Sequence, residues 1–240
     1  MEYQLSNKCF THKSRTKCEK CAVRLIAFCG ILDENDILHL ENISKDKNIL
    51  KGQQVFLQGE SVQTFYNIKQ GSVKIYKLSK DGRQQIVGFL YPGDFLGMSG
   101  DDLYAYSAEA LEDTKLCQFN KTVLENFFLK FPIVESKILN LVNHELAAAQ
   151  DQIFLLGKYS AKERLLQFFL SISNQREKLG WGGNPIRLSM PRSDIANYLG
   201  LTIETVSRSL SDLKNDRIVR MIGTNDIFLN NRDQLPEYLS

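Results

Sequence analysis

The 240-residue sequence contains no long apolar run and no excess of one charge. No stretch approaches the roughly 18 consecutive apolar residues that a membrane-spanning helix requires, and no apolar signal-peptide core follows the N-terminus. Phosphate-binding loops of the GxGxxG or Walker type are absent, and no nucleophile–base pair stands out. We therefore expect a cytoplasmic protein that neither enters a membrane nor acts as an enzyme.

The formal net charge of +2 is an average over unlike segments. Residues 1–25 carry six Lys/Arg against two Asp/Glu, residues 26–157 carry 12 against 17, and residues 158–240 carry 12 against nine. Apolar residues make up 43% of the chain, which is typical of a folded globular protein. The basic C-terminal third makes nucleic acid a partner worth testing.

The residues from Gly52 to Phe119 alternate apolar and polar side chains in short runs. This period of two is typical of half-buried strands, and short strands with regular turns favour a jelly roll. The expected strands include those at 71–77, 85–90, 104–110 and 114–119. We predict a β-roll over residues 31–130, with a short helix at 31–47.

A helical period begins near Val123, and residues 131–157 are predicted to form one long helix. Its apolar residues recur at steps of three and four, which is the a/d pattern of a coiled coil. They are Leu139, Val142, Leu146, Ala149, Ile153 and Leu156. The flanking positions are polar, so the stripe is narrow and favours a homodimer helix. The alternative is a helix that packs on its own domain.

The C-terminal residues 158–240 contain a helix-turn-helix pattern after a helix expected at 161–174. A short helix that opens at Ser193 ends at Gly200, where a tight turn needs positive φ. Thr202 is a suitable N-cap for a second helix that runs to about Leu213. Its expected buried face consists of Ile203, Val206, Leu210 and Leu213. Two apolar runs around the turn at 223–226 predict a hairpin, which makes the module a winged helix.

The opposite face of this second helix carries side chains that can read bases. Arg208 can donate two bonds to guanine, Glu204 can accept from cytosine, and Ser207 can bond to bases or phosphate. Candidates for phosphate contacts are Arg192, Thr202 and Thr205. The alternative is a plain surface helix on which Glu204 and Arg208 form an i,i+4 pair.

The five cysteines are unevenly placed: Cys9, Cys18, Cys21 and Cys29 lie near the N-terminus, and Cys117 stands alone. In a cytosolic protein such clustering suggests metal or redox chemistry more than disulfides. Four thiolates suit a [4Fe-4S] cluster or zinc, and spacing alone does not distinguish them. For zinc, Cys9 or His12 could be the fourth ligand. Cys117 could instead be a buried apolar residue.

A β-roll, a long dimer helix and a winged helix-turn-helix, in that order, resemble the CRP/FNR superfamily of bacterial transcription regulators over nearly the whole chain. The segment Gly93-Asp-Phe-Leu-Gly97 is similar to its Gly-Asp-x-x-Gly turn, and 200–208 is similar to its recognition-helix signature. Glu-x-x-Ser-Arg, here at 204–208, is typical of the FNR branch. The resemblance implies an α+β fold and a homodimer on palindromic TTGAT-type DNA. The turn at 80–83 resembles the RNA polymerase contact surface; a plain turn is the alternative.

The FNR branch also implies an oxygen-sensing [4Fe-4S] cluster on Cys18, Cys21, Cys29 and Cys117. The first three are spaced Cys-x2-Cys-x7-Cys, whereas the FNR pattern has x5 before the third. Cys9 is then surplus. An intact cluster is expected to favour dimerisation and DNA binding. The main alternative is a zinc- or thiol-based redox switch on the same scaffold.

Cyclic nucleotide is not an expected effector. In the family's nucleotide binders a Glu follows the Gly-Asp-x-x-Gly turn, and an Arg-Ser/Thr-Ala triplet takes the phosphate. Met98 and Tyr106 replace the Glu and the Arg. A buried phosphate without a cation would cost several kcal/mol, on the order of magnitude known for unpaired buried charges.

Overall fold

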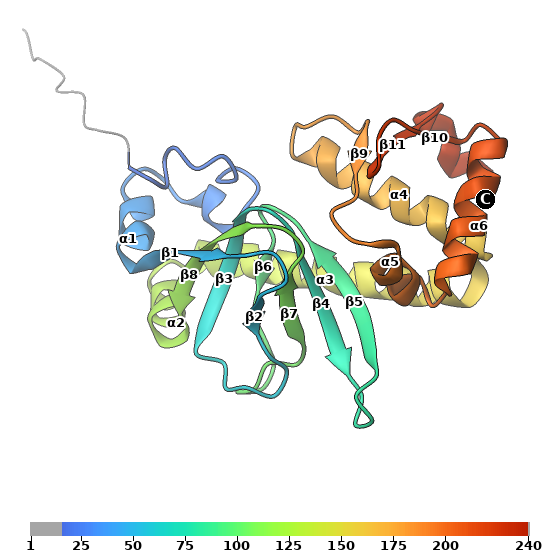
Figure 1. The fold of residues 1–240 in the computed structure, drawn as a ribbon. Helices are drawn as coiled ribbons and strands as arrows, with labels where there is room; N and C mark the ends of the chain where they lie inside the picture. Colours follow the sequence, from blue (N-terminus) through green and yellow to red (C-terminus); the bar gives the residue numbers. More distant parts are fainter. Residues whose placement is uncertain (1–15, 240) are drawn as a thin grey trace, which may run out of the picture.

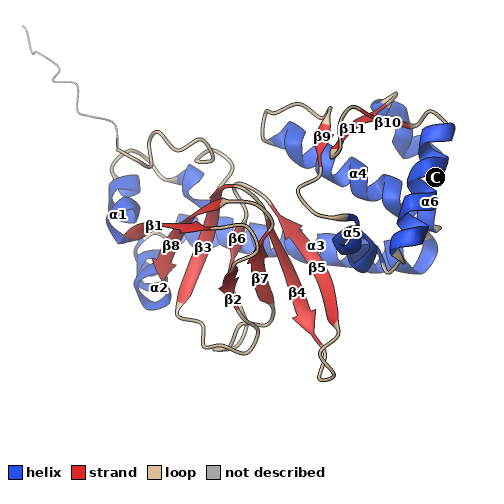
Figure 2. Cartoon of the chain, in the orientation of Figure 1, coloured by secondary structure: helices blue, strands red, loops and turns tan. Residues whose placement is uncertain are grey.

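The computed structural model describes residues 16–239 as a β-roll, one long helix and a C-terminal domain of helices with a small sheet (Figures 1 and 2). The long helix runs along the β-roll to the C-terminal domain. The α+β class expected from the sequence is confirmed. Cys9 and His12 lie outside the described residues.

Two antiparallel four-stranded sheets form the β-roll, in the orders β1-β8-β3-β6 and β2-β7-β4-β5. The strands are β1 (Ser44–Ile49), β2 (Gln54–Phe56), β3 (Thr64–Gln70), β4 (Val73–Leu78), β5 (Gln84–Leu90), β6 (Phe95–Leu96), β7 (Ser107–Ala110) and β8 (Thr114–Asn120). Ile68 and Leu116 from one sheet and Val73 and Ala108 from the other belong to one buried core. The alternating pattern therefore buries one face of each sheet.

The helix predicted at 31–47 is shorter in the structure. A 3₁₀ turn, η1 (Phe28–Ile31), precedes α1 (Asp36–Ile43). The Asp33 carboxylate accepts bonds from the backbone N–H groups of Asn35 and Asp36, both at 2.8 Å. This local turn competes with helix before residue 36.

The strand predicted at 104–110 begins only at Ser107. The backbone of Tyr104 instead bonds to the Gly59–Glu60 loop, with both N···O distances at 2.9 Å. Its hydroxyl donates to the carbonyl of Thr64 at 2.7 Å. Residues before Ser107 are thus ordered by a loop and not by the sheet.

A hairpin joins β4 to β5 and projects from the β-roll (Figure 1). Gly82 has φ +81° at its tip, a conformation that favours glycine. The Asp81 carboxylate accepts from Arg83 Nε at 2.8 Å. The turn predicted at these residues is confirmed.

Two helices follow the β-roll, α2 (Lys121–Lys130) and α3 (Pro132–Lys158), the second in place of the predicted helix at 131–157. Pro132 at the first turn of α3 marks the break, because proline lacks the N–H that would continue α2. Only Val134 and Ile138 of α3 are buried. Within residues 16–239, the helices are too short or too polar to cross a membrane.

The C-terminal domain is a winged helix-turn-helix, as predicted. Its elements are α4 (Ala161–Lys178), β9 (Ile186–Arg187), α5 (Arg192–Leu199), α6 (Ile203–Asn215), β10 (Val219–Met221), β11 (Asp226–Leu229) and η2 (Arg232–Leu239). Gly200 ends α5 with φ +63°, and the Thr202 hydroxyl caps α6. Strand β9, which the sequence does not predict, pairs with β11 and makes the wing three-stranded.

Two details of the predicted helices were wrong. Helix α4 continues to Lys178 instead of ending at Asn174; Arg176 and Lys178 suit the negative end of a helix dipole. Ile203 is 47% exposed, and Ser209 takes a place on the buried face of α6. As the first residue of its helix, Ile203 projects beyond the packed turns that hold Val206.

Candidate metal centre and nucleic-acid interface

The cysteine-bearing segment lies beside the β-roll (Figure 1). Its Phe28 side chain is fully buried in the β-roll core. The Phe28 ring meets Phe95 and Phe119 edge-on, with centroids 5.2 and 5.6 Å apart. A third edge contact joins it to Phe128 at 6.3 Å. This anchor fixes the position of Cys29, the next residue, in η1.

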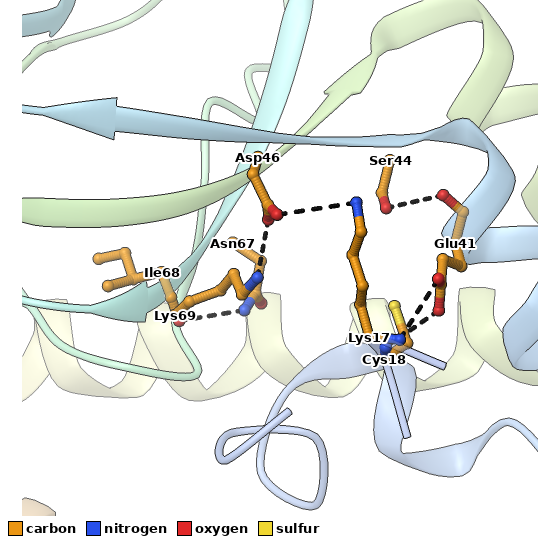
Figure 3. Close-up of polar contacts among 8 residues, drawn as sticks. All are labelled: Lys17, Cys18, Glu41, Ser44, Asp46, Asn67, Ile68 and Lys69. Atoms are coloured by element: carbon orange, nitrogen blue, oxygen red, sulfur yellow. Dashed lines mark hydrogen bonds and ion pairs between the residues drawn. The ribbon is translucent and has the colours of Figure 1, made fainter. Parts of the chain in front are cut away.

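Glu41 of α1 holds the other end of the segment (Figure 3). Its carboxylate accepts from the backbone N–H groups of Lys17 at 3.3 Å and Cys18 at 3.0 Å. These bonds lower the pKa of Glu41 and keep it ionised, although burial opposes the shift. Cys21 follows in the same turn, with its N–H bonded to the carbonyl of Cys18.

Cys117 approaches from the sheet. It lies on β8, paired with Asp46 on β1 and with Asn67 on β3. Asp46 accepts from Lys69 Nζ at 2.7 Å (Figure 3). Burial raises the pKa of the Cys117 thiol, and the nearby Lys69 ammonium opposes only part of this shift.

The structure brings all four predicted ligand cysteines together, and we call Cys18, Cys21, Cys29 and Cys117 the thiol group. Electrostatic interactions link Cys18 to the other three, Cys29 to Cys21, and Cys117 to both Cys21 and Cys29. Every pair is therefore close enough to interact. Turns between Cys21 and Ala27 lead the chain back to Cys29, so the x7 spacing does not separate it from the group.

Burial dominates the acidity of three of these cysteines. It raises the pKa of Cys18 and of Cys117 to about 12, and that of Cys29 to about 11. The neighbouring thiols add to each of these shifts. Without a cation these three thiols therefore stay protonated at neutral pH, whereas a bound metal deprotonates its thiol ligands.

The thiol group does not close around one point. Among the residues from 16 to 239, no three His, Cys, Asp or Glu side chains are grouped tightly enough to hold a single metal ion. A zinc site needs four donors at about 2.0–2.3 Å from the metal. The donor chemistry fits an iron–sulfur cluster, which Cys thiolates hold. All four thiols are free and partly buried.

The predicted base-reading side chains, Glu204, Ser207 and Arg208, share one face of α6, and we call it the DNA-reading face after this prediction. Glu204 and Arg208 are exposed and Ser207 is half-buried. The ion pairs found in the described part of the chain include none between Glu204 and Arg208 within 4.0 Å, so the alternative i,i+4 pair is not formed. Hydrogen bonds from its own backbone and from Thr202 lower the pKa of Glu204. Its carboxylate is thus an acceptor at neutral pH.

The three candidate phosphate contacts flank this face. Thr202 Oγ1 accepts from the Thr205 N–H at 3.2 Å, and their hydroxyl oxygens lie 3.1 Å apart. Arg192 is the first residue of α5, whereas the sequence predicts that this helix opens one residue later, at Ser193. Its Nη1 donates to Ser207 Oγ at 3.3 Å, which joins the two helices beside the DNA-reading face.

The predicted dimer stripe lies along α3 and is mostly uncovered. Leu139, Val142, Leu146, Ala149 and Ile153 are exposed, with Ile153 at 71%. Leu156 is half-buried beside Gly200, and its carbonyl accepts from Arg164 Nη2 at 2.7 Å. The alternative of a stripe packed on its own domain does not hold for the five exposed positions in this chain.

Tyr106, one of the two residues that depart from the nucleotide-binding pattern, belongs to an aromatic cluster beside the Gly93–Gly97 turn. Tyr106 accepts from the Gly97 N–H at 3.3 Å, and its ring lies 5.7 Å from that of Phe56. Phe56 also stacks on Tyr104 at 3.9 Å. Ser107 is fully buried, and its hydroxyl accepts from the Gln58 N–H.

The missed contributors to the thiol group are Glu41, Asp46 and Lys69. They are polar residues in ordinary surface patterns, and no motif marks them. Their role depends on strand register and on tertiary contacts more than 20 residues apart. The sequence therefore contains no signal that would predict the contacts of these three residues near the cysteines.

A β-roll, a long helix with an exposed apolar stripe and a winged helix-turn-helix together define a class of DNA-binding transcription regulators. Comparison with known proteins agrees. Residues 46–131 match the family model of the cyclic nucleotide-binding domain, and residues 163–238 match that of the Crp-like helix-turn-helix domain. The chain belongs to the Crp/FNR family of regulators.

Two curated relatives and one solved structure illustrate the similarity. The nitrogen fixation regulation protein FixK of Bradyrhizobium diazoefficiens is 38% identical over 205 residues, covering 85% of this chain and 86% of its own length. The fumarate and nitrate reduction regulatory protein of Escherichia coli K12 is 33% identical, covering 92% and 89%. The structure of FixK2 from Bradyrhizobium japonicum has 33% identity and a TM-score of 0.75, covering 81% and 96%.

Proposed function

We propose that this protein is a homodimeric, oxygen-responsive transcription regulator whose thiol group holds a [4Fe-4S] cluster. The observation that carries the proposal is the mutual proximity of four partly buried cysteines from segments 88 residues apart. When bound, the cluster would supply iron–sulfur bonds that oxygen attacks. The relatives named as regulators of nitrogen fixation and of fumarate and nitrate reduction are consistent with this role.

The protein's own residues connect the thiol group to the dimer helix. Cys117 is on β8, which leads through Asn120 directly into α2 and then α3. Phe28 beside Cys29 packs on Phe128 of α2. Holding the cysteine segment against the sheet therefore also holds the base of α3. Release of the segment would loosen α2 and with it the pairing of two α3 helices.

Pairing along the α3 stripe would bring two DNA-reading faces into successive major grooves. Recognition helices related by a two-fold axis read half-sites about one helical turn apart. We infer that the site is a palindrome of TTGAT-like halves, read by Glu204, Ser207 and Arg208. The exposed hairpin tip with Asp81 and Arg83 is the proposed contact for RNA polymerase.

Cyclic nucleotide is not the proposed effector, although the β-roll matches the cyclic nucleotide-binding model. Tyr106 stands where the family's nucleotide binders have the phosphate-binding Arg, and its ring packs near Phe56. Neither Met98 nor Tyr106 supplies a positive charge. The lack of a cationic side chain at these two positions supports an effector other than cyclic AMP.

The second candidate is a zinc- or thiol-based redox switch on the same scaffold. It needs the four sulfurs to close around one ion, with Zn–S bonds of about 2.3 Å. Because the four cysteines are free, they could instead be oxidised reversibly by an external oxidant such as a peroxide, once deprotonated. Both alternatives use the thiol group and differ in what it holds.

Anaerobic purification of the full chain tests the proposal. Iron and sulfide should each be close to four per protomer, with visible absorbance that bleaches in air and DNA binding that falls with it. Cys117→Ser should abolish iron retention, because no other thiol on β8 replaces it, whereas Cys9→Ser should retain iron. Colourless protein with stoichiometric zinc would falsify the cluster and favour the second candidate.

A further inference from the structure

A cavity of about 410 Å³ lies where the cysteine segment, the β-roll and the C-terminal domain meet. Val23 contributes from the first, Tyr91 from the second, and Arg176 and Trp181 from the third. The described residues that line it include none of the thiol group and none of the base-reading side chains of α6. Its volume is in the range of small-molecule sites, which are often found between domains.

The walls of this junction cavity are held in place by direct contacts between the two domains. Ser72 Oγ and Ser189 Oγ lie 2.7 Å apart. Lys74 joins Glu109 of the β-roll to Asp194 of α5, both at 3.1 Å, and all three side chains are largely buried. The cavity therefore lies beside a built interface between the two domains.

The acidic groups of the lining already have partners. Glu112 accepts from the Ser72 hydroxyl at 2.8 Å, and Asp113 accepts from the Lys51 N–H at 3.0 Å. The one lysine of the lining, Lys69, is paired with Asp46. The two carboxylates and this ammonium group therefore have protein partners and do not need a ligand.

Three donors of the lining are not accounted for. The Tyr91 hydroxyl and Arg176 Nε are buried without a hydrogen-bond partner in the described part of the chain. Arg187 on β9 pairs with Asp226 of β11 through the backbone, and its exposed side chain has no hydrogen bond or ion pair with residues 16–239. Burial raises the pKa of Tyr91, so its hydroxyl remains a donor. Buried polar atoms without partners are uncommon in folded proteins and each requires an explanation.

The rest of the lining is mostly apolar. Val23, Ile172 and Leu179 contribute aliphatic surface, and the half-exposed ring of Trp181 lies beside them. An occupant must therefore combine an apolar body with acceptor atoms for the three donors. We propose that the junction cavity binds a small organic anion, an aromatic or branched carboxylate, through Arg187, Arg176 and Tyr91.

Such an anion would contact all three parts of the chain at once. It would stabilise the docked arrangement of the C-terminal domain on the β-roll, and so act as a second input beside the thiol group. Only this regulatory role depends on the proposed function. Binding itself does not, and it can be measured whether or not the protein senses oxygen.

Trp181 is the only tryptophan in the chain, so its fluorescence reports the cavity directly. The full chain is titrated with benzoate, and with benzamide as the neutral compound of the same shape. We expect a saturable change in Trp181 emission with benzoate and at least fivefold weaker binding of benzamide. A melting temperature that rises with benzoate alone should accompany it. Equal binding of the two compounds, or no saturable change, overturns the proposal.

Two variants and one control assign the effect to the donors. Arg187→Gln, at an exposed strand position, should weaken benzoate binding at least fivefold without affecting folding. Tyr91→Phe should also weaken it, yet should raise the melting temperature without ligand, because an unpaired buried hydroxyl is removed. Lys77→Gln, at an exposed position on β4, should change neither value. Benzoate binding unaltered in Arg187→Gln contradicts the site. Loss of oxygen response with intact benzoate binding refutes only the proposed function.

Discussion

The thiol group and the DNA-reading face of α6 are assembled in opposite ways. Glu204, Ser207 and Arg208 share a face because they lie on one capped helix of 13 residues. Cys117 joins the other three cysteines only because β8 pairs with β1 and β3 and because Phe28 enters the β-roll core. A local element preserves the first arrangement. The second depends on tertiary packing, which makes it the part of the molecule suited to respond to a disturbance.

Removing the anchor of the cysteine segment should break this comparison most strongly. Phe28→Ala should lower the free energy of unfolding by about 3–5 kcal/mol, because a fully buried ring with three aromatic contacts is lost. Iron retention should fall with it, while the helical signal of the C-terminal domain persists. Urea unfolding and iron analysis measure both effects.

The matched control is Leu25→Ala, in the same segment but 88% exposed. Its free energy of unfolding should remain within about 0.5 kcal/mol of the unchanged protein. If Phe28→Ala retained iron as well as Leu25→Ala does, the thiol group would not depend on this anchor.

A second break concerns the stripe on α3. Leu146→Glu places two like charges opposite each other in a paired helix and should weaken the dimer by about 3 kcal/mol or more, which is over 100-fold. Analytical ultracentrifugation should then show monomers at micromolar concentration, and binding to palindromic DNA should be lost.

Leu129→Glu is the control for the stripe, since Leu129 is 78% exposed on α2 and outside it. It should leave the monomer–dimer equilibrium unchanged. A dimer that tolerates Leu146→Glu would place the protomer interface elsewhere on the molecule.

The same division explains what the sequence could predict. Gly200, Thr202 and the apolar spacing along α6 act within a few residues of each other. The helix-turn-helix and its exposed face could therefore be predicted from the sequence. The strands of the β-roll follow from alternation, but their pairing does not. The ion pair of Lys69 with Asp46 and the bond from Glu41 to Cys18 depend on that pairing.

The cysteine pattern alone could not predict which four thiols lie together. Their types and spacing indicated metal or redox chemistry, and only the family resemblance joined Cys117 to the N-terminal three. The prediction that Ile203 is buried was wrong for a related reason. Periodicity describes the faces of one helix, but it does not say how far the neighbouring elements extend along that helix. In each case the missing information was tertiary.

Asp94 sharpens the comparison, because it is in a local turn motif but its acidity is set by distant packing. Burial raises its pKa to about 6, above the ordinary value of 3.8, although the Tyr91 N–H bond and Lys178 lower it. The protonated form is favoured in the folded state, so this stability is present below about pH 4 and is lost as pH rises through 6. The loss is at most about 3 kcal/mol, two pKa units at 1.36 kcal/mol each.

Asp94→Asn should therefore raise the free energy of unfolding at pH 8 and change it little at pH 4, since an amide keeps the acceptor for Tyr91. Urea unfolding across this range gives the slope. Asp101→Asn, in an exposed loop, should leave the slope as it is. An unchanged slope in Asp94→Asn would mean that this carboxyl is solvated.

The smallest expected effect tests the local side of the comparison. Arg208→Ala should cost roughly 1–3 kcal/mol in binding to the palindrome and should relax preference at one base position of each half-site, since a bidentate contact to guanine is lost. Competition binding with single-base variants of the site measures this, and the thiol group should retain its iron. Lys214→Ala, on the last turn of α6, should leave the base preference intact. A uniform loss across all DNA sequences in Arg208→Ala would assign this residue to the phosphates, and base reading would then rest on Glu204 and Ser207.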